Sequence, residues 1–109
     1  MPESNERGAL TEAVFYILLS LYTPLHGYGI MQKVKSMSAG RVELGAGTLY
    51  GAINTLQQKG WIEPFSPEKL SRKKEYVITS RGKEMVREEL DRLKELLANG
   101  ERIAGGRKK

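Results

Sequence analysis

The fold is decided by residues 45–60, which read GAGTLYGAINTLQQKG. Apolar side chains recur there at the i, i+3, i+4, i+7 spacing of a helix with one buried face: Leu49, Ala52, Ile53 and Leu56. Gly60 marks the expected end, because glycine readily takes the left-handed conformation that terminates helices. The opposite face carries hydroxyl and amide groups but almost no charge, which is unusual for a face that only meets water.

Two helices are predicted before this segment. The first runs from residue 9 or 10 to residue 22 and is apolar on nearly all sides, so it must be covered on all sides. In so small a domain the second cover is expected to be another subunit. A turn over residues 23–27 leads into a second helix over residues 28–37. Residues 41–44 are long enough only for a short edge strand.

Two short strands are predicted after the third helix, at residues 61–65 and 75–78, with a basic hairpin loop between them. A last helix, capped by Thr79 or Ser80, is predicted to reach about Ala98, with Asn99 and Gly100 as its stop. Its apolar stripe has the 4, 3, 4 spacing of a short coiled coil: Val86, Leu90, Leu93 and Leu97.

This order of elements predicts a mainly α fold with a small β-hairpin. It is the order of a winged helix-turn-helix DNA-binding domain followed by a coiled-coil-like dimerisation helix. A helix fits the major groove, and a basic hairpin beside it can lie along phosphates. The expected divisions are a flexible N-terminus at residues 1–8, the winged helix-turn-helix at 9–79, the dimerisation helix at 80–99 and a disordered basic tail at 100–109.

Charge is unevenly placed along the 109 residues. The formal net charge is +5, and all of it comes from residues 66–109. A polyanionic partner is consistent with that distribution. The N-terminus is polar and acidic, and the apolar runs are far shorter than a membrane span, so a cytoplasmic protein without a membrane partner is expected.

Enzymatic and metal sites are not expected. The absence of cysteine excludes disulfides, thiolate zinc sites and thiol nucleophiles, and a single histidine argues against an imidazole metal cluster. No acid–base pair, no nucleophile beside a base and no Walker lysine is visible. We therefore predict no catalytic residue, no metal and no cofactor.

Three fragments in this order and spacing resemble the PadR family of bacterial transcription regulators: HGYGI at 26–30, GTLY at 47–50, and RKKEY at 72–76 leading into ITSRG at 78–82. The resemblance covers residues 10–98. It implies a dimeric winged-helix repressor at an inverted-repeat operator, released by a small hydrophobic or phenolic effector. One departure is Gly51, where many members have proline.

The candidate DNA-contacting residues lie on the second and third helices and the hairpin: Tyr28, Thr48, Tyr50, Asn54, Gln57, Arg72, Lys73 and Lys74. Asn54 and Gln57 are the candidate base readers. Thr48 could instead only cap the third helix, and Tyr28 could pack under the second. The ring of Tyr50 could wedge against the hairpin while its hydroxyl reaches a phosphate. His26 has either a local structural role or a phosphate contact, and the basic cluster at 72–74 could be a solvated loop.

The candidate dimerisation residues lie on the first and last helices: Phe15, Leu19, Val86, Leu90, Leu93 and Leu97. The alternative is that the last helix packs back on its own domain. An apolar channel beside Phe15, Tyr16 and Leu19 is the expected place for an effector. The competing function is a winged-helix protein–protein adaptor without specific DNA binding. An adaptor would favour an apolar exposed patch over the basic cluster at 72–74, and loss of DNA binding on neutralising that cluster would count against it.

Overall fold

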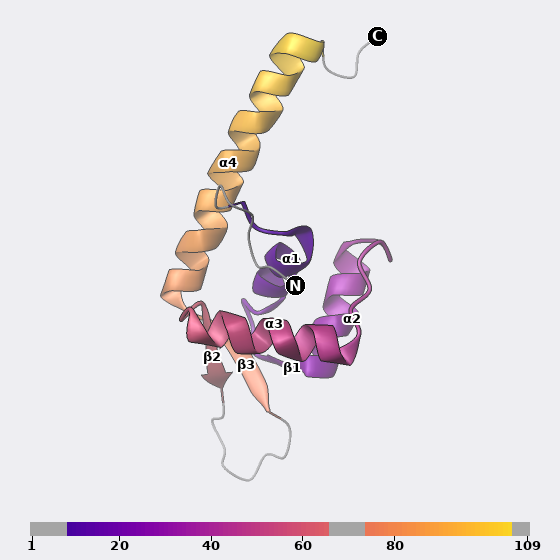
Figure 1. The fold of residues 1–109 in the computed structure, drawn as a ribbon, viewed down its shortest axis with the longest axis vertical. Coiled ribbons are helices and arrows are strands. Elements are labelled where there is room, and N and C mark those ends of the chain that lie inside the picture. The colour runs from indigo at the N-terminus through magenta and orange to yellow at the C-terminus, as the bar shows by residue number, and fades with distance from the viewer. Residues whose placement is uncertain (1–8, 66–73, 106–109) are drawn as a thin grey trace.

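The computed structural model describes residues 9–65 and 74–105, in which the chain is mainly helical with a small antiparallel sheet (Figure 1). The predicted fold class is therefore confirmed. The elements follow one another as α1 (Glu12–Ser20), β1 (Leu25–His26), α2 (Gly27–Met37), α3 (Ala46–Gln58), β2 (Ile62–Phe65), β3 (Glu75–Ile78) and α4 (Ser80–Ala104). The sheet has the strand order β1-β3-β2.

The core lies where α1, α2 and α3 meet the sheet and the first turns of α4. The central helix α1 buries Val14, Ile17 and Leu18, while Phe15 and Leu19 on its other side are only half-buried. The predicted buried face of α3 is confirmed, since Leu49, Ala52, Ile53 and Leu56 are all buried. The helix faces that form the core thus follow the apolar spacing that is visible in the sequence.

The sheet has one strand more than the two strands of the predicted hairpin. Leu25 pairs with Tyr76 and His26 with Glu75, so part of the predicted turn forms β1 on the free edge of β3. The expected strand at residues 41–44 is wrong, because that segment is irregular. Its Val42 N–H donates to the hydroxyl of the buried Ser38 at 2.9 Å, so a side chain satisfies a donor that a strand partner would otherwise take.

Helix α4 continues beyond its predicted end. It runs through Asn99 and Gly100 to Ala104, and the predicted disorder of residues 100–104 is wrong. Arg102 donates to the side-chain oxygen of Asn99 at 2.8 Å, which ties the two sides of the supposed stop together. The helix ends instead at Gly105, whose φ of 85° is left-handed. The predicted boundary at 99 and 100 falls inside one helix, and residues 1–8 and 106–109 lie outside the described residues.

Thr79 joins the hairpin to α4. Its hydroxyl accepts the Gly82 N–H at 3.0 Å as the predicted helix cap and donates to the Gly60 carbonyl at 2.6 Å. A Cβ added at Gly82 would lie 2.2 Å from the Trp61 carbonyl oxygen and 2.6 Å from a side-chain carbon of Ile78. The first turn of α4 can therefore press against Trp61, in the turn between α3 and β2, only because residue 82 has no side chain.

Gly82→Ala is expected to lower the free energy of unfolding by about 1–3 kcal/mol, because the methyl group meets backbone that cannot move aside cheaply. Urea unfolding measures the change. The matched control is Gly51→Ala, in the middle of α3, where an added Cβ meets nothing within 4 Å. That control should raise stability by up to about 1 kcal/mol through helix propensity. Equal effects of the two substitutions would contradict the close approach at Gly82.

Candidate nucleic-acid interface

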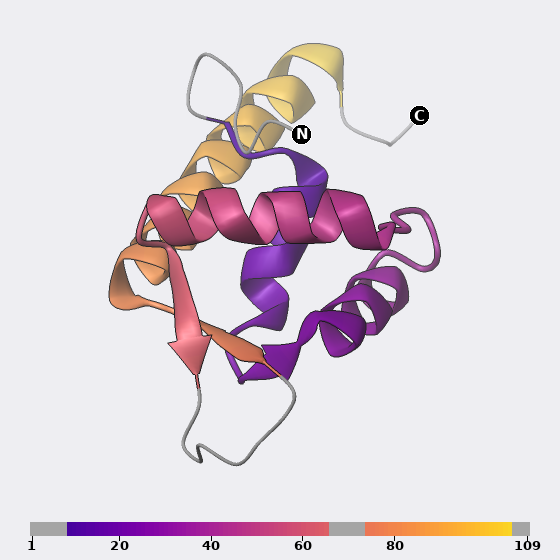
Figure 2. The same cartoon turned by 60° about the horizontal axis from the view of Figure 1, so that its bottom comes forward.

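The outer face of α3 is exposed and carries uncharged hydrogen-bonding groups. Thr48, Asn54 and Gln58 are exposed. Gln57 is half-buried, so its side chain is less available for contact with DNA than predicted. In Figure 2, α3 crosses the front of the molecule with the β2–β3 hairpin below it and α4 behind. The face that the sequence marked as unusual is therefore free of the rest of the described chain.

The start of α3 is also open. Its N-cap is Gly45, which makes no side-chain capping bond, and residues 45–48 are all exposed. The capping role considered for Thr48 is therefore wrong, since Thr48 lies within the first turn. The N–H groups of that turn and the positive end of the helix dipole suit an anion such as a phosphate.

Tyr50 joins α3 to the start of α2. A Cβ added at Gly27, the first residue of α2, would lie 2.1 Å from the Tyr50 hydroxyl oxygen, so the phenol ring covers this glycine. Burial raises the pKa of Tyr76 in β3, and the nearby Tyr50 raises it further. Tyr50 thus lies between α2 and β3 rather than against the hairpin alone. It is still 49% exposed, which leaves part of the ring for a partner.

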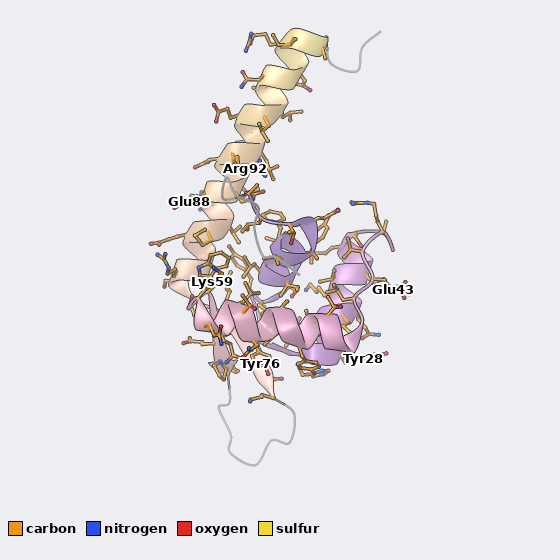
Figure 3. The ribbon with its side chains drawn as sticks, viewed as in Figure 1. Tyr28, Glu43, Lys59, Tyr76, Glu88 and Arg92 are labelled. Atoms are coloured by element: carbon orange, nitrogen blue, oxygen red, sulfur yellow. The ribbon has the colours of Figure 1, made fainter. Side chains whose placement is uncertain are left out.

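At the start of α2, His26 has a structural role and Tyr28 lies on the surface. The Nδ1 atom of His26 accepts the Gly29 N–H at 3.3 Å and so caps the helix, which confirms the local structural role. Tyr28 is 61% exposed, so packing under α2 is wrong for this side chain. Its hydroxyl oxygen accepts a bond from Gln32 at 3.2 Å, and its own O–H remains able to donate. Figure 3 shows Tyr28 and Tyr76 at the end of the molecule opposite to the free part of α4.

The basic hairpin lies beside this face. Lys74 is exposed immediately before β3, whereas Arg72 and Lys73 lie outside the described residues. Segments 66–73 and 106–109 together hold six cations and one acid, which equals the whole formal net charge of +5. The rest of the chain is neutral in sum, so the positive charge is concentrated in the hairpin loop and the C-terminus.

Comparison with known proteins agrees with this geometry. The model of the transcriptional regulator PadR-like family matches residues 15–88. The chain belongs to this family. It is therefore a DNA-binding transcriptional regulator and not an enzyme.

Two solved structures and one sequence relative illustrate the likeness. A PadR-like transcription factor from Bacteroides fragilis has a TM-score of 0.67 at 24% identity, covering 84% of this chain and 87% of that chain. RosR from H. salinarum has a TM-score of 0.62 at 27% identity, covering 83% and 76%. A 37.1 kDa protein in transposon TN4556 of Streptomyces fradiae is 36% identical over 66 residues, which are 61% of this chain and only 18% of that protein.

The PadR-like chain carries a second exposed surface on α4, which is apolar. Val86 is 3% exposed and belongs to the core of its own domain, so its predicted dimer role is wrong. The predicted apolar stripe of α4 is therefore buried at Val86 and exposed from Leu90 onward. Beyond it, large apolar side chains stay exposed: Leu90 (42%), Leu93 (39%), Leu96 (53%), Leu97 (61%) and Ile103 (75%). Sequence reasoning missed Leu96, which lies beside the stripe within the predicted helix, and Ile103, which a helix continued through Gly100 places next to that stripe. We call these five residues the α4 band.

A pocket of about 300 Å³ opens between the start of α1 and α4 in this PadR-like regulator. Phe15, Tyr16 and Leu93 contribute to its lining. Among the described residues no cluster of three His, Asp or Glu side chains could hold a metal ion, and no helix there is both long and apolar enough to cross a membrane.

Proposed function

We propose that the chain is a homodimeric repressor that binds an inverted-repeat operator through two copies of α3 and the hairpin. The observation that carries the proposal is that two different surfaces, the outer face of α3 and the basic hairpin, lie next to each other on one side of the molecule. An exposed, uncharged hydrogen-bonding helix face can read base edges, and a basic hairpin beside it can bind phosphates.

The α4 band supports the dimer. Its five large apolar side chains lie beyond the point where α4 leaves its own domain, so the described part of the chain cannot cover them. A second copy of α4 supplies a surface of the same kind. Two-fold symmetry then places two α3 helices on one side, where they suit half-sites about one DNA turn, or about 34 Å, apart.

We assign base reading to Asn54 and the exposed Gln58 rather than to the half-buried Gln57. An asparagine amide can pair with both hydrogen-bonding groups on the major-groove edge of adenine. Tyr28, Thr48 and Tyr50 supply hydroxyls, and Lys74 with Arg72 and Lys73 supplies charge, for the phosphates on either side.

Asn54→Ala is the test of base reading. Each half-site should lose about 1–3 kcal/mol of discrimination, so a dimer on two half-sites should lose about 30-fold to 10⁴-fold of its preference for operator over scrambled DNA. DNA from upstream of the gene's own operon is titrated in competition with scrambled DNA at several salt concentrations. The slope of affinity against salt should stay unchanged, because no charge is removed.

The matched control is Asn99→Ala, which removes the same side chain from the exposed surface of α4. It should keep the operator preference. If the wild-type protein binds operator no better than scrambled DNA, specific binding fails and the adaptor function takes its place. If only Asn54→Ala has no effect, the assignment of Asn54 is wrong while DNA binding stands.

We further assign a small hydrophobic or phenolic effector to the pocket beside Phe15 and Tyr16. Its volume of about 300 Å³ lies at the lower end of the range for ligand sites. An effector there would act by favouring one angle between α4 and the body and so shift the population of DNA-competent dimers. Addition of phenolic acids should release operator DNA from the wild-type protein. Phe15→Trp should fill the pocket and so abolish this release.

A further inference from the structure

Glu89 is the last residue of α4 that is buried in its own domain. The residues that α4 buries are Gly82, Val86 and Glu89, and every position from 90 to 105 is half-buried or exposed. A carboxylate that is only 5% exposed is costly unless charged or hydrogen-bonding partners surround it. Its place marks the point where α4 leaves the body.

Glu89 has partners on two segments of the chain. Arg92 donates to it with two nitrogens, from Nε at 2.9 Å and from a terminal nitrogen at 2.5 Å. The Leu10 N–H, just before α1, donates to the same carboxylate at 3.4 Å. The Arg92 bonds lower the pKa of Glu89, against the opposing effect of burial, so the carboxylate is ionised at neutral pH. We call these contacts of Glu89, Arg92 and Leu10 the latch.

The space beside the latch is open. The pocket of about 300 Å³ between α1 and α4 is lined by both members of the ion pair and by Glu12, Phe15, Tyr16 and Leu93 among others. Glu12, the other acid there, is bound by Arg41 of the loop after α2. At this level the Leu10 N–H, in the segment just before α1, joins the body to Glu89 beside a partly empty space, and Arg92 holds that carboxylate from within α4. Figure 3 shows Arg92 where α4 rises from the body.

The length of α4 turns a small rotation at the latch into a large displacement. Residues 90–104 extend about 22 Å beyond Glu89 at 1.5 Å per residue. A swing of about 10° at that point moves the far end by about 4 Å, which is close to the rise of one DNA base pair. The angle at the latch therefore matters on the scale of operator spacing.

We propose that the latch fixes the angle between α4 and the DNA-binding body, and so sets which spacing of half-sites the dimer accepts. Glu89 and Arg92 are positioning residues in this scheme, since neither touches DNA. The proposal rests on the dimer of the proposed function, in which paired α4 helices carry two DNA-binding bodies.

The direct test measures the distance between the two bodies without DNA. Because the chain has no cysteine, Lys33→Cys on the exposed side of α2 gives one spin label per subunit. Pulsed electron resonance should give one narrow distance in the otherwise wild-type dimer and a clearly broader or shifted distribution in Glu89→Gln. Glu88→Gln, which removes the same charge from an exposed neighbour, should leave the distribution narrow.

The second readout is operator spacing. The wild-type dimer should prefer its own spacing by at least about tenfold over operators lengthened or shortened by one base pair. Glu89→Gln should reduce that preference to less than about threefold and leave the affinity for an isolated half-site unchanged. Arg92→Lys keeps the charge but loses the two-pronged contact, and it should give an intermediate result in both measurements even if Glu89→Gln does not fold.

The outcomes separate this inference from the proposed function. A narrow, unshifted distance and intact spacing preference in both folded variants would overturn the latch. A protein that is monomeric at the concentrations of the experiment would overturn the dimer and the latch together. Broadened distances in a dimer that does not bind specific DNA would support the latch and count against the operator.

Discussion

Replacing Arg72, Lys73 and Lys74 with alanine is expected to weaken operator binding by at least about 100-fold at 0.15 M salt. Typical specific complexes have dissociation constants of about 10⁻⁸–10⁻¹¹ M, and typical non-specific ones of about 10⁻⁴–10⁻⁶ M. The loss moves the protein from the first class toward the second. The physical reason is that the hairpin supplies charge beside an α3 face that has none.

The salt dependence gives this prediction its sharpest form. Each phosphate contact contributes about 0.9 to the log–log slope of affinity against salt, so losing six cations in a dimer should flatten the slope by about 5. Fluorescence anisotropy with a labelled operator at several salt concentrations measures both affinity and slope. The expected flattening depends on each of the three side chains reaching a phosphate.

The control removes the same charge elsewhere. Arg81, Lys83 and Arg87 are exposed on the first turns of α4, and their triple alanine variant lowers the net charge equally. It should change the slope little. If both triples weaken binding to the same extent, the protein attracts DNA through net charge alone. If the hairpin triple keeps full affinity, the hairpin has no part in binding and the adaptor function gains weight.

Local sequence patterns predicted the elements whose folding is decided locally. The buried face of α3, the strand Glu75–Ile78 and the Thr79 cap all follow from residue types at fixed short spacings. The hairpin was likewise visible as two strand-like runs around a basic loop. Such signals need no knowledge of what lies across the fold.

The features that sequence did not predict depend on distant partners. Strand β1 exists because β3 has a free edge, and Val86 is buried because α4 folds back on the core. The contact of Tyr50 with Gly27 and that of Glu89 with Leu10 join segments far apart in the chain, so no local pattern announces them. Gly100 gave a false stop, since a glycine at an exposed helix position costs only about 1 kcal/mol relative to alanine.

The α4 band carries the other large expected effect. Leu93→Glu with Leu97→Glu should convert the protein to a monomer, because burying four carboxylates in a paired α4 is far costlier than exposing them to water. The body should stay folded, since its core ends at Glu89. Sedimentation equilibrium measures the mass, and far-UV circular dichroism checks the helix content. Lys94→Glu with Ala98→Glu reverses one charge and adds another at exposed positions outside the α4 band, and it should leave the dimer intact.

Loss of the dimer should reach DNA binding through avidity. A monomer binds one half-site at a time, and the loss of the linked second site should lower operator affinity by about 10²–10⁴-fold. Its salt slope should fall to about half of the wild-type value, since half the phosphates are contacted. The variant with alanine at 72, 73 and 74 should behave differently. It stays dimeric, and its salt slope falls by a fixed amount for each charge removed. A dimeric protein with Leu93→Glu and Leu97→Glu would contradict the α4 band as the interface. A monomer that keeps full operator affinity would show instead that one winged helix is enough.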